Sequence, residues 1–254
     1  MNMQDIFVGD TGSGTPLVLV HGFLGSTDMW ENQVGYFKEH YRIITPALPG
    51  FGKSKPLKSC DSIECMAKSI LNSLETKKIE KFHLLGHSMG GMIVQEITKL
   101  AGEKILKLIC YGTGPIGNIP GRFETIDQSR EKLKMNGLES TVYRIAKTWF
   151  IEKDKAKYFH LCTEAGRQTS IEAADNGLVA MKNWSGLDNL KKIKNKTLII
   201  WGDNDKAYNY KQVEILKNNI PNSDLKIIDG CSHNVHLEKP NEFNKILSEF
   251  LKKT

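Results

Sequence analysis

The sequence lacks any apolar run approaching the roughly 20 residues that a membrane-spanning helix needs. Its N-terminus, Met1–Asp5, has neither the basic start nor the apolar core of a secretory signal peptide. The first absence argues against a membrane partner, and the second argues against export. We therefore expect a cytoplasmic protein.

Cysteine is also scarce, and its five residues form an odd number at irregular spacing. Without an export signal, free thiols in a reducing compartment are expected rather than a disulfide framework. The spacing fits no arrangement of metal ligands, so no metal site is predicted. The five are Cys60, Cys65, Cys110, Cys162 and Cys231.

Arginine and aromatic residues are missing from the most basic part of the chain. The formal net charge is +6, but most of the basic residues are lysines scattered along the sequence. The densest run, Lys191–Lys196, contains no arginine and no aromatic residue, whereas both are expected at a nucleic-acid site. This run is therefore expected to be a solvated surface, with no nucleic-acid partner.

The composition is otherwise that of an ordinary globular protein. Hydrophobic residues make up 40% of the 254 residues and charged residues 25%. This length suits one large domain, or a domain that carries a modest insertion. It does not determine the oligomeric state.

Short apolar runs typical of buried strands alternate with helical patterns towards both ends of the chain. Between residues 115 and 186 this alternation stops, and only helical stripes remain. The pattern predicts a doubly wound, mostly parallel α/β sheet from residues 1–114 and 187–254, with 115–186 inserted as an all-helical cap. Strands are expected at 6–8, 17–20, 42–45, 82–85, 107–111, 197–201 and 225–228, with a turn at 9–14.

One stretch organises the rest of the chain. The apolar run 82–85 is followed by Gly86-His87-Ser88-Met89-Gly90, and a helical pattern begins at Met89. A strand that turns directly into a helix brings two backbones close together, so glycine is needed on both sides of the turn. The motif predicts a strained turn that presents the Ser88 hydroxyl, with free helical N–H groups behind it.

Two other glycine-rich stretches resemble nucleotide-binding motifs only formally. Residues 47–54 nearly match a P-loop, but Ala47 replaces its first glycine and Pro56 prevents an immediate helix. Residues 112–117 match G-x-G-x-x-G, yet Pro115 and Pro120 indicate a loop where a dinucleotide site needs a helix. No nucleotide cofactor is predicted.

Candidate partners for Ser88 follow later strands. A serine hydroxyl needs a base, and the base needs an acid to orient it. Asp203-Asn204-Asp205 follows the strand expected at 197–201, and His233 follows the strand expected at 225–228. The order serine, acid, histidine, each beyond a strand, is the order expected for a G-x-S-x-G hydrolase.

With these residues in place, the chain resembles the α/β-hydrolase superfamily, in its group of helical-capped esterases, lactonases and C–C hydrolases. One departure is Ala47, where relatives usually carry an aspartate that serves as a turn element, so activity is not put in doubt. The resemblance covers nearly the whole chain, through His21–Gly25, Leu48–Ser54, Gly86–Gly91, Trp201–Asp205, and Ser232-His233 with Glu238-Lys239-Pro240.

The resemblance implies roles for individual residues. Ser88 is the expected nucleophile and His233 the base, while Asp205 is preferred to Asp203 as the acid because it stands three residues after the strand-end glycine. Two backbone N–H groups, those of Phe23 and Met89, are expected to form the oxyanion hole. The substrate pocket is expected to include Leu24, His87, Trp149, Trp184 and His236.

The expected activity is hydrolysis of a small-molecule carboxylic ester or lactone through an acyl-enzyme, with no metal or organic cofactor. A C–C bond hydrolase, or a lyase or perhydrolase on the same triad, is the alternative within enzymes. A ligand-binding receptor on a hydrolase scaffold is the alternative outside them. The inserted segment is expected to cover Ser88 and to set specificity.

Arginine is unusually concentrated. Only five arginines occur, and Arg122, Arg130, Arg144 and Arg167 all lie within residues 115–186. One explanation is salt bridges to nearby acidic residues. The other is that at least one arginine faces the pocket and binds an anionic group of the substrate. The candidate acidic partners are Glu124, Asp127, Glu131, Glu139 and Glu164.

Overall fold

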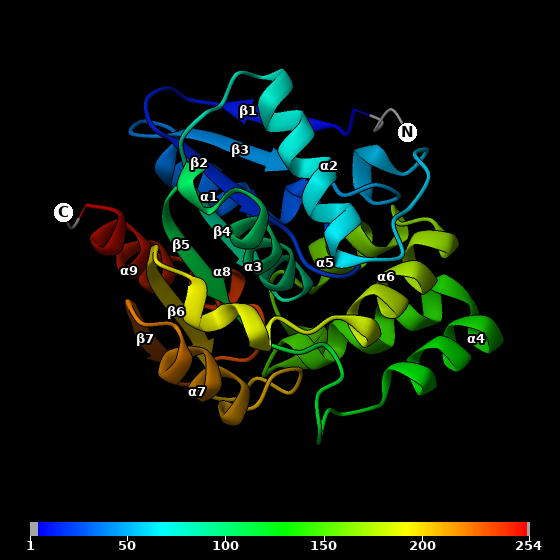
Figure 1. Ribbon diagram of the computed structural model, residues 1–254. Helices are drawn as coiled ribbons and strands as arrows, with labels where there is room; N and C mark the ends of the chain where they lie inside the picture. The colour runs from blue at the N-terminus through cyan, green and yellow to red at the C-terminus, as the bar shows by residue number, and fades with distance from the viewer. Residues whose placement is uncertain (1–4, 253–254) are drawn as a thin grey trace.

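A seven-stranded sheet forms the centre of the protein in a computed structural model, which describes residues 5–252. The strand order is β1-β3-β2-β4-β5-β6-β7, and every neighbouring pair is parallel except β1 with β3. The predicted doubly wound, mostly parallel sheet is therefore confirmed (Figure 1). The strands are β1 Val8–Thr11, β2 Pro16–Val20, β3 Arg42–Pro46, β4 Phe82–His87, β5 Ile105–Tyr111, β6 Lys196–Gly202 and β7 Ser223–Ile228.

The first strand lies later in the chain than its sequence predicts. A strand was expected at 6–8 and a turn at 9–14, whereas β1 spans Val8–Thr11. Its residues pair antiparallel with β3, from Val8 opposite Pro46 to Thr11 opposite Ile43. This edge strand exists because a distant strand offers hydrogen bonds, which local sequence does not report. The N-terminal residues 1–4, considered above for a signal peptide, lie outside the described range.

Helices cover both faces of the sheet. Ser62 is the N-cap of helix α2 (Ile63–Thr76), since its hydroxyl accepts a hydrogen bond from the Cys65 N–H in the first turn. No helix within residues 5–252 is both long and apolar enough to cross a membrane. The α-helices are α1 Glu31–Phe37, α2 Ile63–Thr76, α3 Met89–Ala101, α4 Ile126–Ala146, α5 Phe159–Arg167, α6 Ile171–Asn183, α7 Tyr210–Asn219, α8 Val235–Glu238 and α9 Pro240–Lys252. The 3₁₀ helices are η1 Thr27–Trp30, η2 Gly52–Ser54, η3 Gly102–Lys104, η4 Lys147–Trp149, η5 Lys153–Lys155 and η6 Leu187–Lys192.

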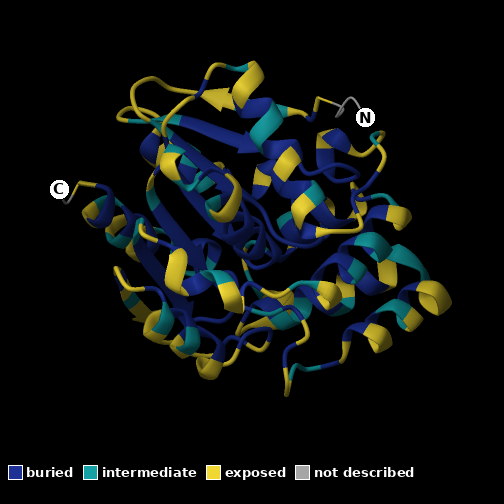
Figure 2. Ribbon diagram, viewed as in Figure 1, coloured by how far each residue is buried: buried dark blue, intermediate teal, exposed yellow. Residues whose placement is uncertain are grey.

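Two hydrophobic layers sandwich the strands, as the alternation along β2 shows. Leu17 and Leu19 belong to the cluster formed with α1 and α9, while Val18 and Val20 belong to the cluster formed with α2 and α3. The central strands are buried and the outer faces of many helices are exposed (Figure 2). Burial on both faces explains why these strands are continuous apolar runs.

Three α-helices of residues 115–186 lie together beside the sheet (Figure 1). The two ends of this segment meet: Ile116 pairs with Ser185 in an antiparallel bridge, and the Gly186 N–H donates to the Pro115 carbonyl at 2.8 Å. Helix α4 is interrupted at Gly137, whose φ of 75° is not helical. The helical segment therefore leaves the sheet and returns to it at nearly the same point.

The expectation of five free cysteines is wrong. Cys60 and Cys65 form a disulfide in the structure, whereas Cys110, Cys162 and Cys231 are free and buried. The turn that begins α2 brings the Cα atoms of the pair to 5.7 Å, within the range that a disulfide spans. Sequence spacing alone does not reveal this approach, because it depends on the conformation of the helix start.

Candidate active site

Ser88 lies on the turn between β4 and α3, with φ of 57° and ψ of −119°. A non-glycine residue at positive φ is strained and must be held there by its surroundings. A Cβ on Gly86 would lie 2.2 Å from the Gly90 carbonyl oxygen, and a Cβ on Gly90 would lie 2.4 Å from that of Val20. Only glycine fits at either position, which is the steric reason for the motif.

Neighbouring strands hold the strained turn in place. The Ser88 N–H donates to the Tyr111 carbonyl at 2.9 Å, and the Thr113 hydroxyl donates to the Ser88 carbonyl at 2.8 Å. Both partners come from the end of β5 and the residues after it. The backbone of Ser88 is thus tied to the sheet, while its side chain lines an internal cavity.

His233 and Asp205 form a buried pair next to this turn. The His233 Nδ1 lies 2.8 Å from the Asp205 Oδ2, and both side chains are almost inaccessible to solvent. The Asp205 Oδ1 accepts hydrogen bonds from the N–H groups of Ala207 at 2.7 Å and Tyr208 at 3.1 Å. A proton on Nδ1 that donates to the carboxylate leaves Nε2 free to accept one, as a general base requires.

Asp203 has a different environment. Its side chain is exposed, and its Oδ1 accepts hydrogen bonds from the Cys231 N–H at 3.2 Å and from the Asn204 side chain at 2.7 Å. The structure therefore brings His233 together with Asp205 and leaves Asp203 on the surface of the loop.

The loop after β2 approaches Ser88 closely. A Cβ on Gly22 would lie 2.9 Å from the Ser88 Cβ, so glycine is required there as well. Within residues 5–252, neither the Phe23 N–H nor the Met89 N–H donates a hydrogen bond. These two N–H groups are therefore available to donate hydrogen bonds to an oxyanion that develops next to Ser88.

The His21 side chain holds this loop in place through two hydrogen bonds. Its Nε2 accepts a hydrogen bond from the Leu48 N–H at 3.1 Å, so Nδ1 carries the proton and donates to the Gly22 carbonyl at 2.9 Å. Burial lowers the pKa of His21 to about 4, so the imidazole stays neutral near pH 7.

The cavity at Ser88 is small and largely enclosed. Its free volume of about 20 Å³ holds about one water molecule. Trp149 lines it, as expected, and several lining residues come from the helical segment 115–186. The lining residues are Phe23, Ser88, Gly117, Ile119, Arg122, Phe123, Ile145, Trp149, Met181, Ala207, Tyr208 and His233.

Four residues expected in the pocket do not line this cavity. The His87 ring stacks on Tyr111 at a centroid distance of 4.5 Å, and the His236 Nδ1 lies 2.9 Å from the Tyr111 hydroxyl. Leu24 is completely buried, and the Trp184 indole donates to Glu96 at 3.1 Å. These side chains are packed against other residues, and their place in the substrate pocket stays a prediction.

Tyr208 is a lining residue that the sequence analysis missed. Its ring lies nearly parallel to that of His233, with centroids 5.8 Å apart. Burial raises the pKa of its phenol to about 12, so the hydroxyl keeps its proton near the Ser88 and Thr113 hydroxyls. The sequence could have indicated Tyr208 as a lining residue, because it stands three residues after Asp205 on the same turn.

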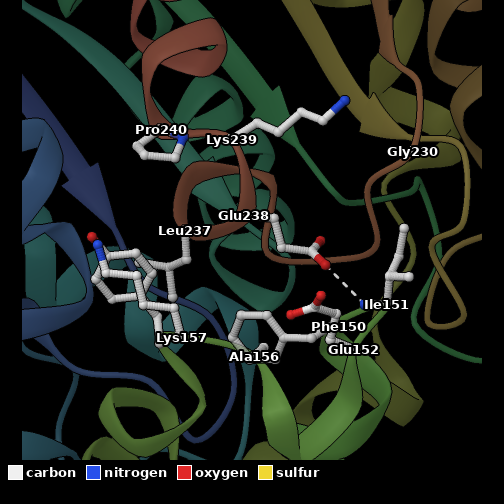
Figure 3. A pocket seen from close by; sticks show the side chains of 11 residues that line it. Phe150, Ile151, Glu152, Ala156, Lys157, Gly230, Leu237, Glu238, Lys239 and Pro240 are labelled. Carbon is white, nitrogen blue, oxygen red and sulfur yellow. Dashed lines mark hydrogen bonds between the residues drawn. The ribbon is translucent and has the colours of Figure 1, made fainter.

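A larger cleft lies elsewhere, where residues 150–158 meet residues 230–240. Its volume is about 450 Å³, but Ser88 does not line it. Figure 3 shows the Glu238 carboxylate between these two parts of the chain. Glu238 accepts hydrogen bonds from the Ile151 N–H at 2.8 Å and the Ser232 N–H at 2.7 Å, and thereby joins the helical segment to the loop that carries His233.

Replacing Glu238 with alanine should therefore destabilise the protein. Two N–H groups lose their acceptor, and each costs about 1–3 kcal/mol where water cannot replace it. For a chain of this size, we expect the melting temperature to fall by about 5 °C or more. Thermal unfolding measures this, and Glu242→Ala on the exposed face of α9 is the control. Equal melting temperatures for the two variants would contradict the joining role.

No group of three or more His, Cys, Asp or Glu side chains in the described part of the chain could hold a metal ion. The charged and polar groups around Ser88 are instead those of the His233–Asp205 pair, Tyr208 and Arg122. Groups of these kinds can transfer protons and bind anions.

Comparison with known proteins agrees with this fold. The sequence matches the family described as the alpha/beta hydrolase fold over residues 15–240. The chain belongs to the α/β-hydrolase family, and the family resemblance seen in the sequence is confirmed.

Relatives with known activities cover almost the whole chain. A pimeloyl-[acyl-carrier protein] methyl ester esterase from Legionella pneumophila is 27% identical and aligns over 98% of this chain and 100% of its own length. A 2-hydroxy-6-oxononadienedioate/2-hydroxy-6-oxononatrienedioate hydrolase from Comamonas testosteroni is 26% identical, over 97% and 91%. The solved structure of an esterase from Exiguobacterium antarcticum superimposes with a TM-score of 0.90 at 25% identity, covering 98% of this chain and 96% of that one.

Proposed function

We propose that the protein is a serine hydrolase that cleaves a carboxylic ester or lactone of a small molecule. One observation carries this proposal: Ser88, on a strained turn, shares a cavity with His233, and the buried Asp205 orients that histidine. Backbone strain of this kind is concentrated at functional sites, and a histidine oriented by a carboxylate can activate a serine hydroxyl.

In the proposed reaction, the Ser88 hydroxyl transfers its proton to the His233 Nε2 and attacks the acyl carbon. The N–H groups of Phe23 and Met89 stabilise the oxyanion. His233 then protonates the leaving alkoxide, which departs as the alcohol. A water molecule gives its proton to His233 and attacks the acyl-enzyme, and the acid leaves as Ser88 regains its proton.

We propose that residues 115–186 form the cap of this site. Gly117, Ile119, Ile145, Trp149 and Met181 from this segment line the cavity with Ser88. Because the cavity has room for only about one water molecule, a substrate requires these side chains to move. The cap is then the part of the chain that selects the acyl or alcohol group.

The relatives support this proposal and one alternative. The Legionella relative is an esterase, as is the Exiguobacterium structure. The Comamonas relative hydrolyses an oxononadienedioate, so hydrolysis of a C–C bond in a dienoic acid is the second candidate. In both reactions a carbonyl carbon has to lie next to the Ser88 hydroxyl. The reactions differ in the leaving group, which is an alcohol in one and a carbon fragment in the other.

A substrate panel tests the proposal. Aryl esters of increasing acyl length, simple lactones and an oxononadienedioate are incubated with the purified protein, with Ser88→Ala as the control preparation. We expect multiple turnovers of at least one ester or lactone. Turnover of the dienedioate alone would favour the second candidate. If the protein reacts slowly and only once with a substrate, without turnover, the proposed enzymatic activity is contradicted and a ligand-binding receptor is favoured.

A further inference from the structure

Four of the five arginines are neutralised by carboxylates. Arg42 binds Asp10 at 2.7 Å, and Arg130 binds Asp175 through two parallel hydrogen bonds of 2.7 and 2.8 Å. The two remaining pairs are Arg144 with Glu124 and Arg167 with Glu139. Two of the acidic partners, Glu124 and Glu139, are among those expected from the sequence, whereas Asp175 is not.

Arg122 is different, because no carboxylate within residues 5–252 forms a salt bridge with it. Its Nη1 is fully buried and has no hydrogen-bond partner in the described chain. The Nη2 of Arg144 is also buried without a partner, but Arg144 binds Glu124 through Nη1. Arg122 stacks on the Phe123 ring at 5.0 Å, but it is the arginine that no carboxylate of the described chain pairs with.

The position of Arg122 connects this charge to the site. It lines the cavity that contains Ser88, and it also lines an outer cleft of about 270 Å³ together with Asp205 and Lys206. Arg122 therefore borders both the cavity at Ser88 and this cleft. A substrate that reaches Ser88 from this cleft passes Arg122.

The carboxylates that could compete for Arg122 are already engaged. Glu124 accepts hydrogen bonds from Ser129 and Lys132 and pairs with Arg144. Asp205 uses one oxygen for His233 and the other for two backbone N–H groups. Neither can turn to Arg122 without breaking those bonds.

A partly buried guanidinium without an acceptor for one of its nitrogens is costly. Burial lowers the pKa of Arg122, but arginine stays protonated in proteins, so the charge itself remains. Leaving such a charge without an acceptor in a partly desolvated site destabilises the fold. A bound anion with two oxygens would offset this cost, because it matches the planar fork of the guanidinium.

We propose that Arg122 binds a free carboxylate of the substrate, so that the enzyme acts on an ester or lactone that also carries a carboxylate. This inference rests on the proposed hydrolase function. The surrounding lining is largely apolar, with Ile119, Phe123 and Met181. It therefore suits a hydrocarbon chain that separates the carboxylate from the scissile carbonyl.

Matched substrate pairs test this inference. On the acyl side, mono-4-nitrophenyl adipate is compared with 4-nitrophenyl hexanoate; on the alcohol side, 4-carboxyphenyl hexanoate is compared with phenyl hexanoate. We expect the wild type to favour the anionic member of one pair in kcat/KM. Arg122→Lys should reduce that preference about ten- to a hundredfold, since a charged hydrogen-bond pair is lost or weakened. Most of the change should appear in KM.

Arg130→Lys is the matched control, because it alters an arginine that pairs with Asp175 away from the cavity. It should leave the preference for the anionic substrate as in the wild type. The inference is overturned if the wild type shows no preference in either pair. An equal loss for the anionic and neutral members in Arg122→Lys would also overturn it.

Binding without turnover separates this inference from the proposed function. Calorimetry measures the affinity of monoethyl adipate for Ser88→Ala and for Ser88→Ala with Arg122→Lys. We expect binding to the first variant and at least tenfold weaker binding to the second. If the affinities differ in this way but the wild type turns over no ester or lactone, the hydrolase proposal is wrong and the carboxylate site is still supported. Equal affinities, or competition by inorganic phosphate as strong as by the monoester, would overturn the carboxylate site.

Discussion

Ser88→Ala should abolish ester hydrolysis, with a loss in kcat of about 10⁶-fold, as for the nucleophile of subtilisin. The reason is that alanine cannot form the acyl-enzyme, and the His233–Asp205 pair then has no hydroxyl to activate. Activity towards the best ester of the panel measures this loss. A fluorophosphonate probe, which reacts with activated serines, should label the wild type and not the variant.

Ser232→Ala is a suitable control, because Ser232 adjoins His233 but its hydroxyl contacts the backbone carbonyls of Thr148 and Asn204 at 3.3 Å. It should keep the labelling at Ser88. Full labelling that persists in Ser88→Ala would show that another serine is the nucleophile, and the assignment of the site would fail.

Asp205→Asn should lower kcat by about 10⁴-fold, the loss seen when the acid of a serine-protease triad is made neutral. The Asp205 Oδ2 lies 2.8 Å from the His233 Nδ1, and an amide nitrogen there would stabilise the opposite tautomer of the ring. His233 would then carry its proton on Nε2, the nitrogen that has to accept the serine proton, and it could no longer act as the base.

Asp203→Asn serves as the matched control. It makes the same chemical change two residues away, on an exposed side chain that does not contact His233. We expect a far smaller loss. Steady-state kinetics on one ester, with circular dichroism to check the fold of both variants, decide the outcome. The reverse ranking would mean that Asp203 is the acid in solution.

Some of the architecture could be predicted because it depends on short-range sterics. The apolar runs that became β2, β4, β5 and β6 are buried on both faces, and such strands show in sequence as unbroken runs. Gly86 and Gly90 are needed because two backbones meet at Ser88. The order of Ser88, Asp205 and His233 places each beyond a strand end, and parallel strands bring these ends to the same edge of the sheet.

Other features were misread because their partners are distant in sequence. β1 depends on β3, some 35 residues away. His87 and His236 both contact Tyr111 and do not line the cavity at Ser88, which their residue type does not reveal. The Cys60–Cys65 disulfide depends on how a helix begins. Amino-acid composition and local pattern do not reveal these contacts.

By itself, the sequence determined the sheet, the turn that carries Ser88, and the chain order of the three proposed catalytic residues, since each follows from the conformations open to a few neighbouring residues. Only the tertiary structure decided which side chains line the cavity and which arginine lacks an acidic partner. The reason is that Arg122, Tyr208 and Ser88 are separated by 30 to 120 residues, by their numbers. They meet only when the helical segment packs against the carboxyl ends of the strands.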